Sequence, residues 1–489
     1  MTGPFSVTLD TSILQSAPDG TADAPGFAFA QATNTGLYRN QDGNAVLTTQ
    51  GQDVLVLDPE GLDFDLKDAP LLPSPLSLGQ ALSGVDVTPQ MFDAENAIAN
   101  HKPCDAAIER ALAYLARTGG GILKFPRGFY YLDKSINITT SNIWLVGVGH
   151  GSTVLNFQAS SNAMNGVRFT VNSEGQTQYR GGCLDMALVC KGTAQASDAG
   201  TFGLCTDATD DLLFRCLTIS GFANGVGIMN TANTVRVQDI DVSDVANDAF
   251  YVNSPTSQYL VGCTGYQNFT PTGAGFHIQR TGGFMMTDCV SGGYISGCLI
   301  DPPEGATVQD GQILNCNFDD SQSVNINVDT THGGYAINLD FTNARTGWSG
   351  KYGVAINGAN TTGVKFLGGS ASRCLQHGVL IEGGNNIEFH GFHSRGNGAE
   401  NPGLYDGFAL TGGESIVIVG GMAGPYAPRN SSETYGLSQQ YGLVASSTFT
   451  GALRVVGTNL QGNLAGPVLL DAPQADISFT QCIGYTPAH

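Results

Sequence analysis

Three carboxylates recur at the same place in the sequence, directly after short apolar segments. Asp301 follows GCLI, Asp329 follows NINV, and Glu382 follows GVLI. If these segments are strands stacked about 4.8 Å apart, Asp301 and Asp329 lie about 5 Å apart at the backbone, and Asp329 and Glu382 about 10 Å apart. Glycosidases need two carboxylates, about 5–5.5 Å apart for retention of configuration or about 6.5–9.5 Å apart for inversion. The three residues are therefore candidate catalytic residues for the cleavage of a polysaccharide.

The same position has two other interpretations. On successive segments it is occupied by Met229, Asn253, Gln279, Asp301, Asp329, Asn357, Glu382 and Thr411. Asn and Asp at corners often bond the backbone of the turn that follows, which would make the column structural. Converging carboxylate and amide oxygens can also bind a divalent cation. Such a cation is possible at this column but is not required.

A second group of residues is suited to binding a sugar. The group consists of Asp319, Asp320, Arg345, Trp348, Arg373, His393 and Arg395. All of them follow the second corner of their repeats, so they are predicted to lie on one face. Sugar rings stack on indole, while arginine and aspartate bond hydroxyl groups or the carboxylate of a uronate. The alternative is an ordinary solvated face. Trp348 favours the binding site, because it is one of two tryptophans and lies in a glycine-rich loop.

The cysteines and histidines do not indicate a metal site. The eleven cysteines form no CxxC pairs, and one column at the second corner reads Cys216, Asp239, Cys263, Cys289 and Cys316, ending near Cys482. One cysteine per repeat in a straight column suits packing, since thiolate metal sites need converging ligands. His377, His390 and His393 fall on different strands or corners. We expect reduced, buried cysteines, as in a protein made in a cytoplasm, with no metal site and no cofactor.

Short segments of one form recur along the chain and must position all of these residues. They begin at Gly225, Ala249, Gly275, Gly297, Asn325, Gly353, Gly378, Gly407 and Gly442, with less regular members at Gly166 and Pro467. From Gly225 to Gly407 the intervals run from 22 to 29 residues, a drifting period that is typical of a solenoid. One short strand cannot bury its own apolar face, but stacked coils bury a continuous core. The chain is therefore predicted to be all-β, with a right-handed single-stranded parallel β-helix.

The composition agrees with this class. Glycine makes up 66 of the 489 residues and charged residues only 13%, which suits many short strands and tight turns. The formal net charge of −21 argues against nucleic acid or an anionic membrane as a partner. We find no apolar run of the roughly 18 residues that a membrane span needs. The start of the sequence lacks the basic region and apolar core of a signal peptide.

Two segments carry a resemblance to a known family. DAAIERALAYLARTGGGILKFPRGFYYL, from Asp105, resembles the start of the pectate-lyase-like β-helices of bacteriophage tailspikes, where a DxxAI helix precedes a glycine run and ΦxFPxGxY. Residues Gly119 to Tyr130 match this pattern, whereas the family's upstream FGAxGDGxxDD segment is replaced here by GVDVTPQMFDAENAIANHKPCDAAI. Pro25 to Gly61 is similar to the F-x-F-x-x-D-x-N-T-G-ΦY-R module of phage tail fibres and spikes. A proline-rich stretch follows from Asp68.

The resemblance implies a spike of a phage or phage-like particle, built as a homotrimer and displayed on the virion surface after synthesis in a bacterial cytoplasm. Residues 1–75 would be a small β domain for trimerisation and attachment to other virion proteins. Residues 76–130 would form a neck and a helix that caps the open end of the solenoid, and residues 131–489 the receptor-binding β-helix. The implied partner is a host capsular or O-antigen polysaccharide. One alternative is a depolymerase, an endoglycosidase or lyase using the same groove, and another is a cellular pectate-lyase-like enzyme.

Overall fold

The computed structural model of the chain describes residues 20–29, 32–41, 45–50, 52–58, 61–63, 86–92, 94, 98, 100–158, 164–191, 200–267, 272–426 and 438–485. Two compact units are distinguished, Met1–Leu82 and Ser83–His489. The predicted boundary at residue 75 and the proline-rich stretch from Asp68 lie outside the described residues.

The first unit contains a small antiparallel sheet in which neighbouring strands follow one another along the chain. Its strands are β1 (Phe27–Phe29), β2 (Ala32–Arg39), β3 (Ala45–Thr49), β4 (Gln52–Asp58) and β5 (Gly61–Asp63). Val46 on the third strand is fully buried. Its register partners on the two flanking strands are Tyr38 and Val56. The prediction of a small N-terminal β unit is confirmed, and its role in attachment stays a prediction.

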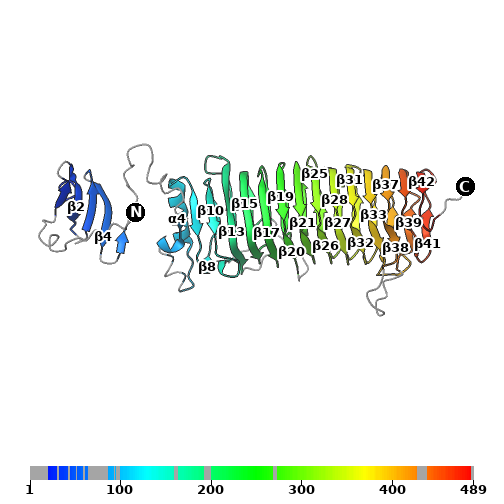
Figure 1. Cartoon of the computed structure of the whole chain (residues 1–489), viewed down its shortest axis with the longest axis horizontal. Coiled ribbons are helices and arrows are strands. Elements are labelled where there is room, and N and C mark those ends of the chain that lie inside the picture. The colour runs from blue at the N-terminus through cyan, green and yellow to red at the C-terminus, as the bar shows by residue number, and fades with distance from the viewer. Residues whose placement is uncertain are drawn as a thin grey trace, which may run out of the picture. The chain divides into compact units, whose positions relative to one another are not determined.

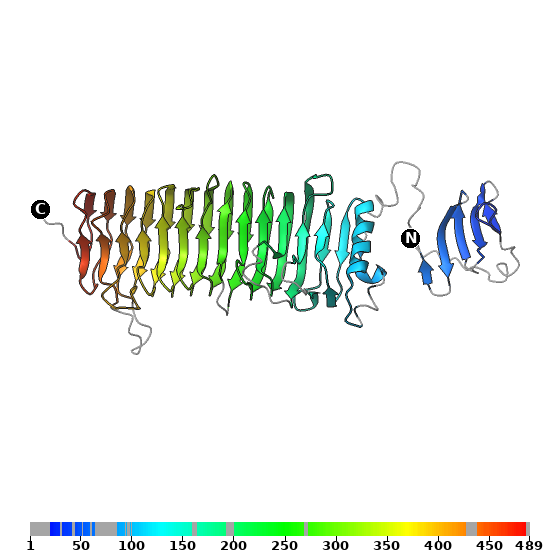
Figure 2. The ribbon, with the colours of Figure 1, turned by 180° about the vertical axis from the view of Figure 1, so that it is seen from behind.

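The second unit is a parallel β-helix, with its turns stacked in chain order along one axis (Figures 1 and 2). One face is a 13-stranded parallel sheet, with one strand from each turn. These strands are β9 (Ile136–Ile138), β12 (Val167–Phe169), β14 (Phe202–Asp207), β16 (Asn224–Met229), β18 (Phe250–Asn253), β21 (Ala274–Arg280), β24 (Ser296–Ile300), β27 (Val324–Asp329), β30 (Tyr352–Asn357), β33 (Val379–Ile381), β36 (Phe408–Leu410), β39 (Tyr441–Ala445) and β41 (Gly466–Leu470).

The register of this face confirms the repeat read from the sequence. Val354 pairs with Ile326 on the preceding turn and with Val379 on the next. These three side chains are fully buried and point into the coil. The residues that directly precede the inward positions form a column of their own, and every predicted repeat start lies in that column. Two turns escaped the sequence analysis, those of β9 and β14. Strand β14 places Gly203 in the same column, where an added Cβ would lie 2.4 Å from the side chain of Ile219.

The other two faces are joined into one 24-stranded sheet. Strands β13 (Gln178–Cys190), β15 (Thr209–Ser220) and β17 (Val235–Ser243) run through both faces. The second face also contains β6 (Asp86–Val87), β7 (Gly121–Lys124), β10 (Ile143–Val146), β19 (Ser257–Val261), β22 (Gly283–Thr287), β25 (Thr307–Leu314), β28 (Tyr335–Thr342), β31 (Thr361–Leu367), β34 (Asn385–His390), β37 (Ser415–Val419), β40 (Ala452–Val456) and β42 (Asp476–Thr480). The third face also contains β8 (Gly128–Leu132), β11 (Thr153–Phe157), β20 (Thr264–Tyr266), β23 (Val290–Gly292), β26 (Asn317–Asp319), β29 (Arg345–Gly347), β32 (Ser370–Ser372), β35 (His393–Arg395) and β38 (Met422–Gly424).

At most turns a single residue with positive φ makes the bend between the second and third faces, whereas Gly368–Gly369 and Gly420–Gly421 supply two. Asp288, Asn315 and Asn343 adopt φ values of 54°, 54° and 58° at this bend, and Gly368 and Gly391 follow on the next turns. Asp, Asn and Gly are the residues that enter the left-handed region most readily. The chain can therefore turn within one residue and begin the third face at once.

The predicted cysteine column was wrong for two of its members, Cys216 and Asp239, because of where this bend lies. Cys263, Cys289 and Cys316 are fully buried at equivalent inward positions just after it, and Cys482 lies in the same column at the last turn. Cys216 and Asp239 occupy the bend itself, one residue earlier. In their turns Leu217 and Ile240 fill the inward position. All eleven cysteines are free.

The predicted capping helix is α4 (Asp105–Arg117), which lies at the N-terminal end of the solenoid (Figure 1). Ile108 and Leu115 are buried against the first turns and Leu112 is partly buried. The Asp105 carboxylate accepts the backbone N–H groups of Asp133 and Lys134 at 3.1 and 2.9 Å. A short 3₁₀ helix, η2 (Pro89–Phe92), precedes α4. Among the described residues, no helix has the length and hydropathy of a membrane span.

Aromatic residues form ladders inside the coils. Phe341, Phe366 and Phe389 occupy one register position on three successive turns. Their rings are nearly parallel, with centroids 4.6 and 4.8 Å apart, and all three are fully buried. Because the coil spacing equals the stacking distance of aromatic rings, repetition of one residue type gives both burial and stacking.

Candidate functional site

A groove with a volume of about 650 Å³ lies on the third face and crosses four successive turns. It is lined by Asn317, Asp319, Asn343, Arg345, Thr346, Gly347, Trp348, Gly368, Gly369, Ser370, Ser372, Arg373, Gly391, His393, Arg395 and Tyr426. Most of these residues come from strands β26, β29, β32 and β35 and from the bends on either side of them.

The short strands of the third face explain why these side chains meet. Side chains alternate between the two faces of a strand, so the middle residue of each three-residue strand, such as Phe318 or Ala371, is buried. The first residues form one outward row, Asn317, Arg345, Ser370 and His393. The last residues form a second row, Asp319, Gly347, Ser372 and Arg395. In the second row, the small residues Gly347 and Ser372 leave the groove open between the charged side chains of Asp319 and Arg395.

Trp348 and Arg373 occupy the corner that follows these strands. They have φ values of 52° and 59°, which is unfavourable for a bulky side chain. The equivalent residues on other turns include Gly293, with φ 81°, and Gly396, with φ 61°. A tryptophan and an arginine at a corner suited to glycine are backbone outliers of the kind that functional sites hold.

An aromatic pair surrounds the guanidinium group of Arg373. Its Cζ atom lies 4.7 Å from the ring centroid of Trp348 and 4.1 Å from that of Tyr426. Arg395 also approaches Tyr426, with its Cζ atom 5.5 Å from the ring. Arg373 is buried, whereas Trp348 keeps 43% of its surface exposed. Cation–π contacts of this kind fix the planes of the groups involved, so one face of the indole remains available in a fixed orientation.

Burial changes the ionisation of two groups in the groove. Desolvation raises the pKa of the Asp319 carboxyl, although the Asp320 backbone N–H and Arg373 both favour its ionised form. Burial and the nearby charge of Arg395 lower the pKa of His393. Both shifts favour the uncharged forms. Three arginines, Arg345, Arg373 and Arg395, line the groove together with one carboxylate, so positive charge is in excess there.

The structure brings together six of the seven residues that the sequence analysis grouped as a sugar site. Asp320 is the exception. It is exposed at the corner, and its backbone N–H donates to the Asp319 carboxylate at 3.0 Å. Tyr426 joins the groove without having been predicted, since it follows the third-face strand β38 in a loop with no repeat pattern. The function of the group stays a prediction.

The three candidate catalytic carboxylates lie at the C-terminal ends of strands β24, β27 and β33 of the 13-stranded sheet. None of them lines the groove. Asp301 and Asp329 are on adjacent turns, as predicted, because Ile300 pairs with Val328. The three side chains have different partners. Asp301 binds His277, Asp329 accepts from both the N–H and the hydroxyl of Thr331 at 2.9 and 2.6 Å, and Glu382 is within 3.0 Å of the Asn357 amide group. Asp329 therefore bonds the turn that follows it, the structural alternative for this column.

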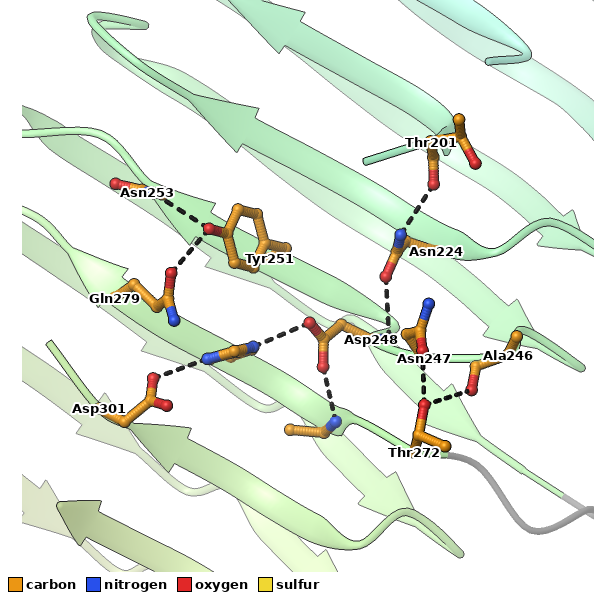
Figure 3. Close-up of polar contacts among 12 residues, drawn as sticks. Thr201, Asn224, Ala246, Asn247, Asp248, Tyr251, Asn253, Thr272, Gln279 and Asp301 are labelled. Atoms are coloured by element: carbon orange, nitrogen blue, oxygen red, sulfur yellow. Dashed lines mark hydrogen bonds and ion pairs between the residues drawn. The ribbon is translucent and has the colours of Figure 1, made fainter. Parts of the chain in front are cut away.

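His277 joins two turns through carboxylates on both sides of its ring (Figure 3). Its Nδ1 atom lies 2.8 Å from Asp248 and its Nε2 atom 2.6 Å from Asp301. Burial disfavours the charged ring, but the hydrogen bonds and charges of both carboxylates outweigh it and raise the pKa of His277 to about 10. Tyr251 packs against the ring edge-on, with centroids 5.3 Å apart. The imidazolium is a buried cation shared by two anions, a cluster that the sequence analysis did not find.

Two other histidines, His377 and His390, each have a partner of their own. The Nδ1 atom of His377 accepts the backbone N–H of Asp406 at 3.0 Å, and burial lowers the pKa of this ring to about 4. His390 lies 2.7 Å from Glu388 on the second face. Within the described part of the chain, no three His, Cys, Asp or Glu residues are arranged to hold a metal ion.

Comparison with known proteins finds likeness in structure only. No family model matches the sequence, and no curated protein matches it. Tailspike protein 3 of bacteriophage CBA120 superposes with a TM-score of 0.58 at 14% identity, over 86% of this chain and 65% of that one. The tailspike of E. coli bacteriophage HK620, solved as a double mutant in complex with a pentasaccharide, gives a TM-score of 0.56 at 11% identity over 81% of this chain and 80% of that one.

An enzyme module has a similar fold. The A-module of the Azotobacter vinelandii mannuronan C-5 epimerase AlgE4 gives a TM-score of 0.52 at 14% identity, over 80% of this chain and 99% of that one. At such identities the likeness establishes the parallel β-helix and leaves the activity to be argued from the residues of the site.

Proposed function

We propose that this protein is a spike of a phage or phage-like particle that binds a host surface polysaccharide in the third-face groove. The observation that carries the proposal is the placement of an exposed tryptophan beside arginines and an aspartate in one groove of a solenoid. Indole stacks on sugar rings, and the charged groups bond hydroxyl or carboxylate oxygens. The N-terminal β unit would attach the spike to other virion proteins at the particle surface. Binding of this kind requires no cofactor.

Cleavage in the same groove is less well supported than binding. Hydrolysis of a glycosidic bond requires two carboxyl groups, and Asp319 is the only carboxylate among the described lining residues. The column of Asp301, Asp329 and Glu382 belongs to a different face. A depolymerase activity of the groove, by hydrolysis or elimination, is the second candidate, because desolvation raises the pKa of the Asp319 carboxyl, the direction that a general acid requires.

Trp348→Gly tests the groove. Loss of the indole removes the stacking surface, and we expect polysaccharide affinity to fall by about 1–3 kcal/mol. Glycine suits the positive φ at this corner, so the thermal unfolding midpoint should stay the same or rise. Isothermal titration against host capsular or O-antigen polysaccharide measures the first quantity, and calorimetry the second.

Asp320→Gly is the matched control for this experiment. It changes the equivalent corner on the preceding turn, but it removes a side chain that does not line the groove. Its affinity should equal that of the wild type. Undiminished binding by the Trp348→Gly variant would show that the polysaccharide binds elsewhere.

We further propose that the chain is a homotrimer that associates through the outer surface of the 13-stranded sheet. An apolar strip runs along one outward column of this sheet. Ala355, Leu380, Ala409, Val444 and Leu469 occupy successive turns, and Leu299 lies two turns before Ala355, with Asn327 between them. Ala355, Leu380 and Ala409 are covered by neighbouring side chains, so Leu299, Val444 and Leu469 are the members that keep surface for a partner.

Light scattering should therefore give three times the 51.0 kDa mass of one chain. Val444→Asp places a charge on the strip and should reduce the mass to that of the monomer. Val456→Asp, on the exposed side of the second face, should leave it unchanged. A wild-type mass of one chain would contradict the trimer.

A further inference from the structure

The groove gathers positive charge in a chain that is acidic overall. The protein has 21 Lys and Arg residues against 42 Asp and Glu, with a formal net charge of −21. Three of these cations, Arg345, Arg373 and Arg395, nevertheless line a single groove that contains one carboxylate. A neutral sugar offers no charge to such a site, whereas an anion would be attracted to it against the acidic background.

The arginines are arranged so that an extended ligand can reach more than one of them. Arg345 lies on β29 and Arg395 on β35, two turns further along, which is about 10 Å at the backbone. The turn between them contributes Ser370 and Ser372 to the two outward rows. Serine side chains are short, so the guanidinium groups of both arginines face the same open space. Two cations at this spacing suit a polymer with repeated negative charges better than a single small anion.

Two buried nitrogen atoms in the groove lack a hydrogen-bond partner. These are Nδ1 of His393 and Nε of Arg395, for which no partner is found among the described residues. Buried polar atoms in folded proteins almost always have hydrogen-bond partners, because an unpaired one destabilises the fold. An oxygen atom of a bound ligand would accept from the Nε–H group of Arg395, and from Nδ1 of His393 in the tautomer that carries its proton there. Both nitrogens lie in the turn of β35, which marks that end of the groove as an acceptor-binding position.

We propose that the polysaccharide bound in this groove is acidic, with sugar carboxylates at Arg345 and Arg395 and a sugar ring against Trp348. This inference rests on the proposed function and specifies the ligand of the same site. Arginine matches carboxylate geometry through two parallel N–H donors. Arg373, held between Trp348 and Tyr426, orients the stacking surface rather than reaching along the groove. Asp319 is the single carboxylate among the described lining residues, so the three arginines outnumber it in the groove.

The experiment compares carboxylated bacterial capsular polysaccharides with the same polysaccharides after chemical reduction of their carboxyl groups to alcohols. Binding to the full chain is measured by isothermal titration calorimetry, which can be applied equally to the wild type and to variants that lack Trp348. We expect at least one acidic polysaccharide to bind, with an affinity that falls as salt screens the charges. Its carboxyl-reduced form should bind at least about tenfold more weakly, as expected for loss of charge-assisted hydrogen bonds.

Two variants assign the effect to the groove. Arg395→Gln keeps most of the side-chain length but removes the charge, and it should weaken binding of the acidic form about tenfold or more. Its affinity for the reduced form should change little. Arg127→Gln removes an exposed cation from the first turns, remote from the groove, and should bind both forms like the wild type.

The outcomes separate this inference from the proposed function. Equal affinity for the acidic and reduced forms, with binding of both still weakened by Trp348→Gly, would overturn the acidic ligand and leave the groove as a sugar site. Binding that is unaffected by both Trp348→Gly and Arg395→Gln would overturn the groove itself. Failure of the chain to bind any polysaccharide in either form would overturn both.

Discussion

Replacement of His277 by glutamine is expected to lower the free energy of unfolding by about 3 kcal/mol at pH 6, near the lower end of the range for breaking a buried ion pair. The wild-type imidazolium is held between Asp248 and Asp301, at 2.8 and 2.6 Å. Glutamine removes the positive charge and leaves two carboxylates close together with no cation between them. The side chains retain 12–17% of their exposed surface, which is why the lower end of the range applies. Chemical denaturation of both proteins measures the difference.

The contribution of His277 should depend on pH in a defined direction. Its pKa is about 10 in the folded protein and about 6.5 in an unfolded chain. The folded state therefore binds the proton more tightly, and the stabilisation is fully present below pH 6.5. It decreases as the pH rises from 6.5 and is lost as the pH passes through 10. The difference in stability between the wild type and His277→Gln should narrow over this window.

A matched histidine provides the control. His390 also contacts a carboxylate, Glu388, but its side chain is 38% exposed. Exposed pairs contribute about 0–1 kcal/mol, so His390→Gln should have a small effect on the free energy of unfolding. A gap between wild type and His277→Gln that stays constant from pH 6.5 to 10 would contradict the assignment of a charged ring.

Phe366→Ala is expected to cost about 3–5 kcal/mol of unfolding free energy, the usual range for removal of a buried phenyl ring. The ring is fully buried and stacks on Phe341 and Phe389, with centroids 4.6 and 4.8 Å away. Its loss leaves a cavity in the middle of the ladder, and the rings above and below cannot close it because their own turns fix their height. Calorimetric or denaturant-induced unfolding measures the loss.

Phe129→Ala is the control, because this ring is 58% exposed. Substitutions at such positions usually change the free energy of unfolding by less than about 0.5 kcal/mol. Phe366→Leu should give an intermediate loss, since it restores part of the volume. If Phe366→Ala cost no more than Phe129→Ala, the ladder would not be a major source of stability.

The repeat and the rows of the groove could be predicted because each turn is built in the same way. Inward and outward positions alternate with a period of two residues, and stacking transfers this alternation from turn to turn. The repeat starts from Gly225 to Gly442 therefore fall in one column. For the same reason, Arg345, His393 and Arg395 could be placed on one face before the structure was known.

Errors arose where one residue changes the direction of the chain. The left-handed bend between the second and third faces shifts the alternation by one position, which moves Cys216 and Asp239 out of the inward cysteine column. Sequence spacing alone does not show which of two neighbouring residues adopts positive φ, since Asp, Asn, Gly and even Cys are found there.

The sequence by itself determined the parallel β-helix, its capping helix and the two outward rows of the groove, because these follow from local alternation repeated at a regular interval. Only the tertiary structure decided how individual side chains are paired. It placed Tyr426 over Arg373 and directed Asp301 to His277 rather than to Asp329. These contacts depend on loop paths and on side-chain orientations across turns, and neither is repeated along the sequence. Burial then decided the charges, since the distance to neighbouring groups and the loss of water set whether His277 and His393 carry a proton.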